Sequence, residues 1–557
     1  MPYFDESKKS FSERISNGID GVIGFFSPAA AARRMAARYV ARTMFGSEYR
    51  GASRDRTTYD WNPRGYSADE SLLYELPTLR SRSRDLVRNN PYAAGAIDTV
   101  TVNVVGSGLR PQSRIPHELI GIPKGSADEF QRQAEYIWHQ WTPFADAANK
   151  IDFYDMEALI IRQILENGEV LILPMMVDDP IDRPLSTAFD IIEADRLATP
   201  PGRSGDKKIR SGVEIGDRGQ PLAYWVKKTH PGDITVGISR QDDYIRYPAY
   251  RKDGRRNIIH IFPISRPGQT RGAPFFAPAM QYFKDMAAYM EAEIVAARIA
   301  ACFAIFVESP DPSLMPSMKD TRTDTASGRK KSWIEPGMMQ HLAPGEKISS
   351  FAPDRPNSSA DAFINHILRA IGSSLGLPYE LLVKDFSKTN YSSARAALLE
   401  ARRFFQNRRV FLTKYFCQPV WSMVLEEAYL RDKIKAPRFY QNYYGYTRTR
   451  WIAGPWGWVD PTKEIDASLK AVDGNISTMS DEIAAQGQDY EEVIEQRARE
   501  KAFTKKMEEK YGIKLSPEDK PATPQDPGNS GAEDPDSEPA DPDKEPKTEP
   551  APAGQED

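Results

Sequence analysis

The stretch that decides the fold is Pro274–Ser309, which reads PFFAPAMQYFKDMAAYMEAEIVAARIAACFAIFVES. Its first part, Pro274–Ala301, is rich in good helix formers and predicts a helix of about 28 residues. The helix continues into CFAIFVES, whose β-branched and aromatic residues predict a strand. A second helix is expected at Ser358–Leu375, after short strands and turns. A small β module therefore lies between two helices. The first helix leads from a large domain to this module, and the second leads back to the large domain.

The other segments are arranged around that module, in a chain of 557 residues that is too long for one compact core. Residues 65–272 mix amphipathic helices with short strands, so we expect one α+β domain in an overall helix-rich α+β fold. Pro419 is expected to kink a long helix. The remaining predicted segments are an arginine-rich N-terminal arm (1–64), a polar loop region (376–393), the long helix (392–434), a helical segment (435–505) with two helices at Trp456–Phe503, and a C-terminal tail (506–557).

The formal net charge of −4 averages two unlike regions. Ser516–Asp557 holds 13 acidic residues, three lysines and ten prolines, so this acidic tail carries a net −10 and the other 515 residues a net +6. An acidic, proline-rich segment without aromatic residues cannot bury enough apolar surface to fold, so we expect disorder there. The two cysteines, Cys302 and Cys417, are too few and too far apart for a disulfide framework. No run of 18 apolar residues predicts a membrane span.

The sequence lacks the common catalytic signatures. It contains no P-loop motif and no Gly-x-Ser-x-Gly elbow. Its six histidines never have the spacing of zinc ligands, so we predict no catalytic residue, metal site or cofactor. The aspartate pairs Asp178–Asp179 and Asp242–Asp243 leave a two-metal nuclease as an open alternative.

Five stretches together carry a resemblance to a known family. They are NNPYAAGAIDTVTVNVVGSGLRPQS (Asn89–Ser113), ILENGEVLI (Ile164–Ile172), IIEADRL (Ile191–Leu197), RGAPFFAPAMQYFKDMAAYMEAEIVAARIAA (Arg271–Ala301) and GPWGWVDPTKEIDASLKAVDGNIST (Gly454–Thr478). In this order they resemble the lambda-type portal proteins of tailed bacteriophages, over roughly residues 20–505.

The resemblance implies a ring, typically of twelve copies, at one vertex of the capsid. Double-stranded DNA would pass through the axial channel during packaging and ejection, and the protein would not be an enzyme. The alternatives are a DNA-packaging nuclease or ATPase, or another minor structural protein of the capsid. The implied location is the virion, after assembly in the cytoplasm of the host bacterium, without a membrane partner.

The same resemblance implies roles for the predicted segments. Residues 65–272 and the long helix 392–434 would form the wing, and 435–505 the crown. The helices at 273–301 and 358–375 would form the stem around the channel. Residues 302–357 would form the clip, where the terminase large subunit and the head-completion (adaptor) protein dock, while major capsid and scaffold proteins would contact the ring elsewhere. In the clip, the expected docking residues are Trp333, Glu335, Glu346 and Lys347.

The polar loop between the second stem helix and the long helix would be a tunnel loop that projects into the channel. Its candidate DNA-facing residues are Lys384, Lys388, Thr389, Asn390 and Tyr391. The alternative is an ordinary solvated loop with Ser392 or Ser393 as the cap of the helix. Further along that helix, four arginines would face either DNA or, as we favour, a neighbouring subunit: Arg395, Arg402, Arg403 and Arg409.

Overall fold

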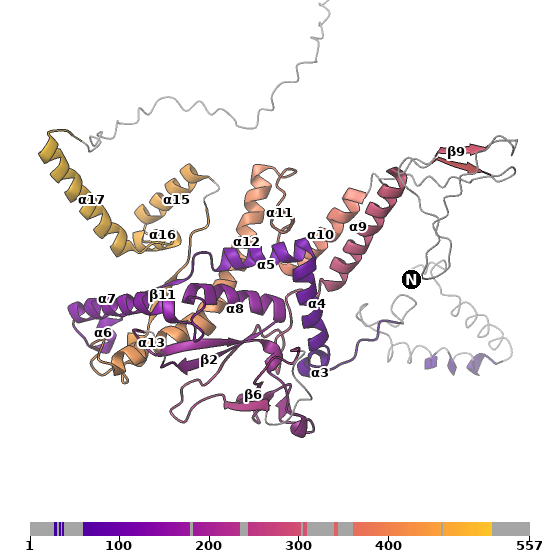
Figure 1. Cartoon of the computed structure of the whole chain (residues 1–557), viewed down its shortest axis with the longest axis horizontal. Helices are drawn as coiled ribbons and strands as arrows, with labels where there is room; N and C mark the ends of the chain where they lie inside the picture. The colour runs from indigo at the N-terminus through magenta and orange to yellow at the C-terminus, as the bar shows by residue number, and fades with distance from the viewer. Residues whose placement is uncertain are drawn as a thin grey trace, which may run out of the picture.

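The computed structural model describes residues 27–30, 33–34, 36–37, 60–178, 182–233, 243–301, 305–308, 339–342, 360–457 and 460–514. Within these ranges the fold is α+β and rich in helix, as the sequence predicted. A main domain of helices and three small sheets carries a long helical stalk, and a group of C-terminal helices lies on another side of it (Figure 1).

Helices of the main domain begin and end at residues with a clear physical role. Asn90 caps the N-terminus of α5 by accepting the N–H groups of Tyr92 and Ala93, each at 3.1 Å, and Pro91 is the first helical residue, as predicted. Gly168 ends α8 with a φ of 88°, which suits glycine. These helices are α3 (Ala68–Leu72), α4 (Leu76–Asn89), α5 (Pro91–Val104), α6 (His117–Ile120), α7 (Lys124–Trp141) and α8 (Phe153–Asn167).

Three antiparallel sheets belong to the main domain. The first has the order β3-β2-β8 (Thr187–Ile192, Val170–Met176, Ile259–Ile261). The second has the order β4-β5-β6-β7 (Ile209–Arg210, Val213–Ile215, Pro221–Lys227, Tyr244–Pro248). The third pairs β1 (Arg110–Ser113) with β11 (Thr449–Ile452), which closes the domain with residues far apart in sequence.

The long helix spans the main domain nearly as predicted. It consists of α12 (Tyr391–Leu412), a π-helical segment (Thr413–Cys417) and α13 (Gln418–Leu430). The π-helical segment ends at Cys417, two residues before Pro419, which has no N–H to donate and whose ring would clash with an ordinary α-turn. The helix is anchored in an aromatic core, where the ring centroids of Trp138 and Trp421 lie 5.3 Å apart.

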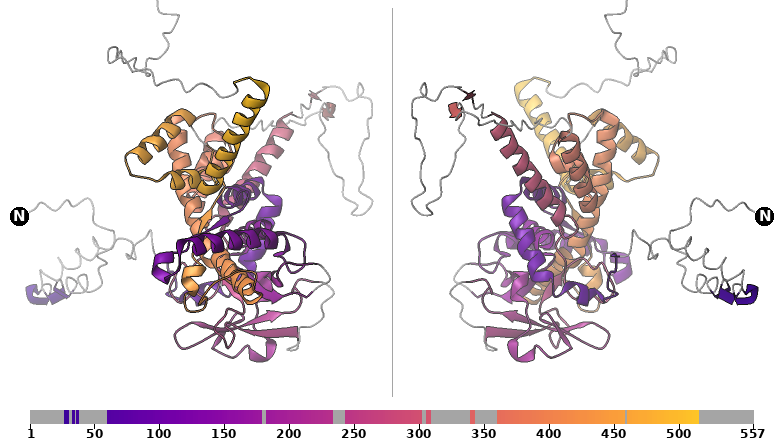
Figure 2. Two further views of the ribbon diagram at one scale, coloured as in Figure 1. Left: turned by 90° about the vertical axis from the view of Figure 1, so that its left-hand side faces the viewer. Right: turned by 90° about the vertical axis from the view of Figure 1, so that its right-hand side faces the viewer.

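The helical stalk is built from α9 (Met280–Ala301) and α10 (Ala360–Leu375). The two helices lie side by side and project from the main domain (Figure 1, Figure 2), and the rings of Tyr289 and Phe363 lie 5.2 Å apart between them. At the far end, β9 (Ile305–Glu308) pairs in parallel with β10 (Met339–Leu342). The helix–strand–strand–helix order of the prediction is therefore confirmed for the described residues.

The predicted start of the first stalk helix was wrong. The helix begins at Met280 rather than Pro274, and Phe276 is buried in the core at the base of the stalk. Pro278 explains the difference, because a proline at this position cannot supply the backbone hydrogen bond that a continuous helix from Pro274 would need.

The C-terminal part also differs from the prediction of two helices. Residues 435–452 pack with the main domain, since Phe439 and Tyr446 are fully buried there. Beyond them lie three helices, because Thr478 and Asp489 each cap a new one with their side chains. The helices are α14 (Tyr443–Tyr446) in the main domain and then α15 (Pro461–Asp473), α16 (Met479–Ala485) and α17 (Tyr490–Tyr511).

Candidate functional site

The predicted tunnel loop is shorter than its sequence range. Residues 379–383 form a short helix, α11 (Tyr379–Val383), which was not predicted from the sequence. Lys384 ends α11 in the left-handed conformation, with a φ of 60°. Asn390, rather than Ser392 or Ser393, caps α12 by accepting the N–H of Ser393 at 2.8 Å. The loop therefore comprises residues 384–390, held between two helix ends.

The candidate residues of the loop are mostly exposed. Lys388 Nζ lies 3.2 Å from an Asp361 carboxylate oxygen on α10, but both side chains are about three-quarters exposed, at 74% and 73%. Such a surface ion pair contributes little, so the ammonium group can exchange its partner. Thr389 is half-buried, with its hydroxyl 3.5 Å from Glu380 on α11. Lys384, Asn390 and Tyr391 are exposed.

Arg409 is committed to contacts within the chain. Its guanidinium donates to the carbonyl oxygens of Asn103 and Val104, each at 2.9 Å, and lies 4.0 Å from the centre of the Trp456 ring. These carbonyls are at the C-terminus of α5, where a helix leaves them without partners of its own. Only 8% of Arg409 is exposed, and burial lowers its pKa to about 10. The predicted role toward DNA or a neighbouring subunit does not fit this residue.

The other three arginines of the long helix lie nearer to solvent. Arg402 is half-buried and donates to the carbonyl of Gly457 at 2.6 Å. Arg403 is exposed and lies 3.5 Å from Glu400, one turn earlier. Arg395 is half-buried near the start of α12. Arg395 and Arg403 therefore keep the surface position that the prediction requires, and their role stays a prediction.

A buried ion network, which no sequence pattern predicted, joins the base of the stalk to the main domain. Glu169, at 0% exposure, accepts from Arg271 Nε at 2.6 Å and also from Arg80. Its second oxygen accepts the N–H of Gly272 at 2.8 Å and lies 2.9 Å from His260 Nε2. Burial opposes ionisation, but the surrounding cations outweigh it and hold the pKa of Glu169 well below its usual range.

Arg271 extends this network to the second sheet. It donates to the carbonyls of Ala194 and Leu197, at 2.9 and 3.0 Å, and to that of Ser211. Because Arg271 and Gly272 directly precede the residues that lead into α9, the network fixes where the stalk leaves the domain.

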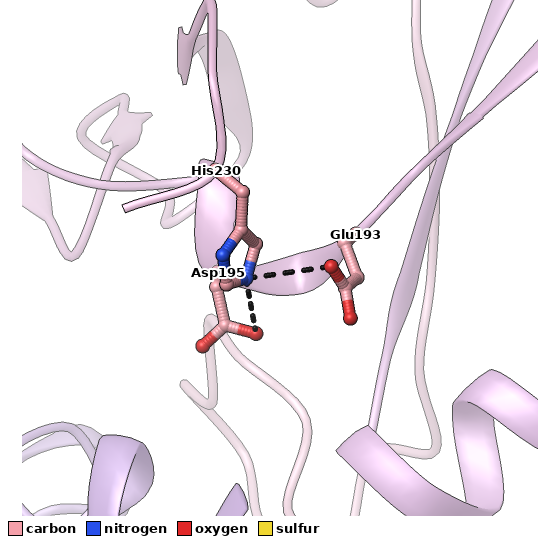
Figure 3. A group of neighbouring side chains, drawn as sticks. All are labelled: Glu193, Asp195 and His230. Atoms are coloured by element: carbon pink, nitrogen blue, oxygen red, sulfur yellow. Dashed lines mark ion pairs between the residues drawn. The ribbon is translucent and has the colours of Figure 1, made fainter. Parts of the chain in front are cut away.

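Glu193, Asp195 and His230 form the group that most resembles a metal site among the described residues (Figure 3). His230 Nε2 lies 3.3 Å from Glu193 and 3.8 Å from Asp195. Its Nδ1 accepts the N–H of Gly232 at 3.0 Å, so in a neutral ring the proton is on Nε2, which makes no hydrogen bond of its own among the described residues. The guanidinium of Arg84 pairs with the same two acids. The group is therefore an ion-pair cluster in which Arg84 offsets one of the two carboxylate charges.

Glu157 and Cys417 meet where the π-helical segment ends. Both are fully buried, the thiol lies 3.2 Å from the carboxyl group, and the N–H of Leu109 donates to Glu157 at 2.8 Å. Burial raises the pKa of Glu157 to about 8, and it raises the pKa of Cys417 well above the ordinary value. A buried thiol with a raised pKa is not an activated nucleophile.

Several predictions fall outside the described residues. These include the clip residues Trp333, Glu335, Glu346 and Lys347, and one aspartate of each pair, Asp179 and Asp242. The predicted disorder of the tail also lies outside the described residues after residue 514, whereas its predicted start at residue 506 was wrong, because α17 continues to Tyr511. Among the described helices, none is both long and apolar enough to span a lipid bilayer.

The helical stalk, the long kinked helix and the loop between them are the features that the resemblance expected of a phage portal subunit. The profile of the phage portal proteins of the lambda family matches residues 54–409, so the chain belongs to that family.

Individual portal proteins align with the chain over most of their length. The chain is 28% identical to the portal protein of Escherichia phage N15 over 482 residues, which covers 82% of this chain and 88% of that protein. It is 27% identical to portal protein B of Escherichia phage lambda over 468 residues, covering 79% of this chain and 86% of that protein.

Solved structures that resemble the chain are more distant. The neck of a native GTA particle with C12 symmetry is 15% identical, with a TM-score of 0.33 and coverage of 60% of this chain and 81% of that chain. The neck of an empty GTA particle with C6 symmetry is 14% identical, with a TM-score of 0.35 and coverage of 77% and 94%. At these TM-scores the chain traces differ too much for structural details to be carried over.

Proposed function

We propose that this portal protein is the repeating subunit of a ring at one vertex of the capsid, and that double-stranded DNA enters and leaves through the axial channel of the ring. The observation that carries the proposal is the helical stalk, because two long helices that project from a domain can stand side by side with those of neighbouring copies and enclose a channel. Family membership supports the same function. A closed ring of identical chains also needs head-to-tail contacts, for which the exposed flanks of the stalk offer surface.

The segments take distinct positions in this proposal. The stalk helices α9 and α10 are the stem, residues 302–357 the clip, the main domain with the long helix the wing, and α15–α17 the crown. The loop 384–390 faces the channel, where Lys384 and Lys388 contact phosphates without reading sequence. Because the ring repeats each lysine in every subunit, weak and salt-screened contacts form a positive belt along which DNA slides.

The proposal assigns partners by position. The terminase large subunit and the head-completion protein dock at the clip, in turn, while scaffold and major capsid proteins contact the ring during assembly in the host cytoplasm. The protein acts as a structural conduit and a component of the virion. A packaging nuclease or ATPase is the rival function, and a shell protein the third.

The position of the protein on phage heads tests this proposal. Tailless heads would be labelled with gold-conjugated antibodies raised against the purified chain. Label at a single vertex is the expected result. Label over the whole shell would contradict the proposal and favour the minor shell protein.

A further inference from the structure

Three loops at one end of the four-stranded sheet concentrate the positive charge of the chain. Residues 201–208, 216–220 and 249–257 together hold eight basic and three acidic residues, a net +5, whereas the 515 residues before the acidic tail carry a net +6 in total. The sheet lies on the side of the main domain that faces away from α17 (Figure 1, Figure 2).

Strand pairing places the three loops together. β5 ends at Ile215 opposite Pro221, where β6 begins, and the register of β6 with β7 sets Ala223 against Pro248, where β7 ends. β4 begins at Ile209 opposite Glu214 of β5, so the loop before β4 comes to the same end. We call this surface the basic end, and its exposed cations are Arg203, Lys207, Lys208, Arg218, Arg251, Lys252, Arg255 and Arg256.

Only part of this charge is balanced within the chain. Lys208 lies 3.6 Å from Asp217, and Arg255 lies 2.6 Å from Glu426 and 3.5 Å from Asp253. For Lys207, Arg218 and Lys252, no ion pair is found within the part of the chain that the structure covers. Arg251 contacts the amide of Asn257 at 3.4 Å, and Arg256 lies 5.8 Å from the ring of the exposed Tyr250. Most of these cations are therefore available to an anionic partner.

We propose that the basic end binds the phosphate backbone of double-stranded DNA on the outside of the subunit, separately from the channel. Four strands at a spacing of about 4.8 Å spread the loops over roughly 14 Å, similar to the ~12 Å width of the major groove, so the loops can contact phosphates on both sides of that groove. Arg251, Arg255 and Arg256 supply planar guanidinium groups, which suit phosphate oxygens. The contacts read no sequence, because nothing in this surface needs to enter the groove.

Covalently closed circular DNA separates this surface from the channel, since a circle cannot thread a closed ring. The test variant replaces Lys207, Arg251, Lys252 and Arg256 with glutamine in the full chain. The matched control makes the same charge change on α17, at the exposed residues Arg497, Lys501, Lys505 and Lys506. Each binding reaction uses relaxed circular duplex over a range of salt concentrations, and electron microscopy of the same samples records whether rings are present.

The parent and control chains are expected to bind the circles with a steep salt dependence. Each lost phosphate contact should reduce the magnitude of the slope of log K against log salt by about 0.9. The four substitutions of the test variant should therefore reduce it by up to about 3.6. Equal slopes for the test variant and the control would overturn the proposal. Absence of circle binding by both the full chain and a chain ending at Lys514 would also overturn it, and would leave an acidic protein surface as the partner of the basic end. Because ring formation is scored separately, this failure differs from failure of the portal proposal.

Discussion

Replacing Glu169 by glutamine should destabilise the chain by about 3–5 kcal/mol, the usual cost of leaving one partner of a buried ion pair without its counter-charge. The carboxylate is fully buried and accepts from two arginines through one oxygen and from Gly272 and His260 through the other. Glutamine has one acceptor oxygen, and its NH2 group would face the N–H of Gly272. Two buried arginines would therefore lose their counter-charge.

The matched control is Glu214→Gln. Glu214 also pairs with an arginine through both oxygens, at 2.9 and 3.0 Å from Arg246, but the Arg246 side chain is 41% exposed. Surface pairs of this kind contribute about 0–1 kcal/mol, so the control should change stability little. Urea unfolding followed by tryptophan fluorescence gives the midpoint for the parent and both variants.

The pH dependence gives a second readout. Because the pKa of Glu169 is lowered in the folded chain, its contribution is present above the ordinary value of 4.5 and is lost as pH falls toward the folded pKa. The difference in the free energy of unfolding between the parent and Glu169→Gln should therefore be constant from pH 8 to about pH 5 and should shrink below pH 5. A Glu169→Gln midpoint within experimental error of the Glu214→Gln midpoint would refute the assignment of the network as the anchor of the stalk.

The remaining predictions concern the loop 384–390, the buried Glu157 beside the π-helical segment, and Arg409 of the long helix. Lys384→Glu with Lys388→Glu should leave rings intact but reduce the DNA packaged per head, and a normal phage yield would contradict the loop's role. The raised pKa of Glu157, about 8, predicts that stability falls as pH rises from about 4.5 to 8, because Glu157 ionises first in the unfolded chain. Glu157→Gln should flatten this decline of the melting temperature with pH. An unchanged decline would contradict the burial of a protonated Glu157. Arg409→Lys should lower the free energy of unfolding in urea by roughly 1.5–3 kcal/mol, because hydrogen bonds from a charged donor to the end of α5 are lost. The control Arg403→Lys should leave stability unchanged. Equal unfolding midpoints for the two variants would contradict the contacts of Arg409.

Local signals in the sequence predicted much of the fold. The cap at Asn90, the stalk helices around a small β module and an irregularity of the long helix near Pro419, seen as a π-helical segment, each follow from residues within one or two turns of each other. Boundaries were less certain where two local signals compete, as at Asn390, where an amide and two serines could each cap the helix.

Contacts between distant residues could not be read from the sequence. Arg409 was expected at the surface with Arg395, Arg402 and Arg403, yet tertiary folding brings the end of α5 to it. Glu169 meets Arg80 and Arg271 only once three elements are packed. Such pairings depend on the tertiary arrangement, which periodicity does not encode.

The most direct test of the central claim is the mass and shape of the purified protein, measured by mass photometry with negative-stain electron microscopy. Twelve copies of the 62.7-kDa chain predict a particle of about 750 kDa with an open centre. A stable monomer with nuclease or ATPase activity would contradict the portal account.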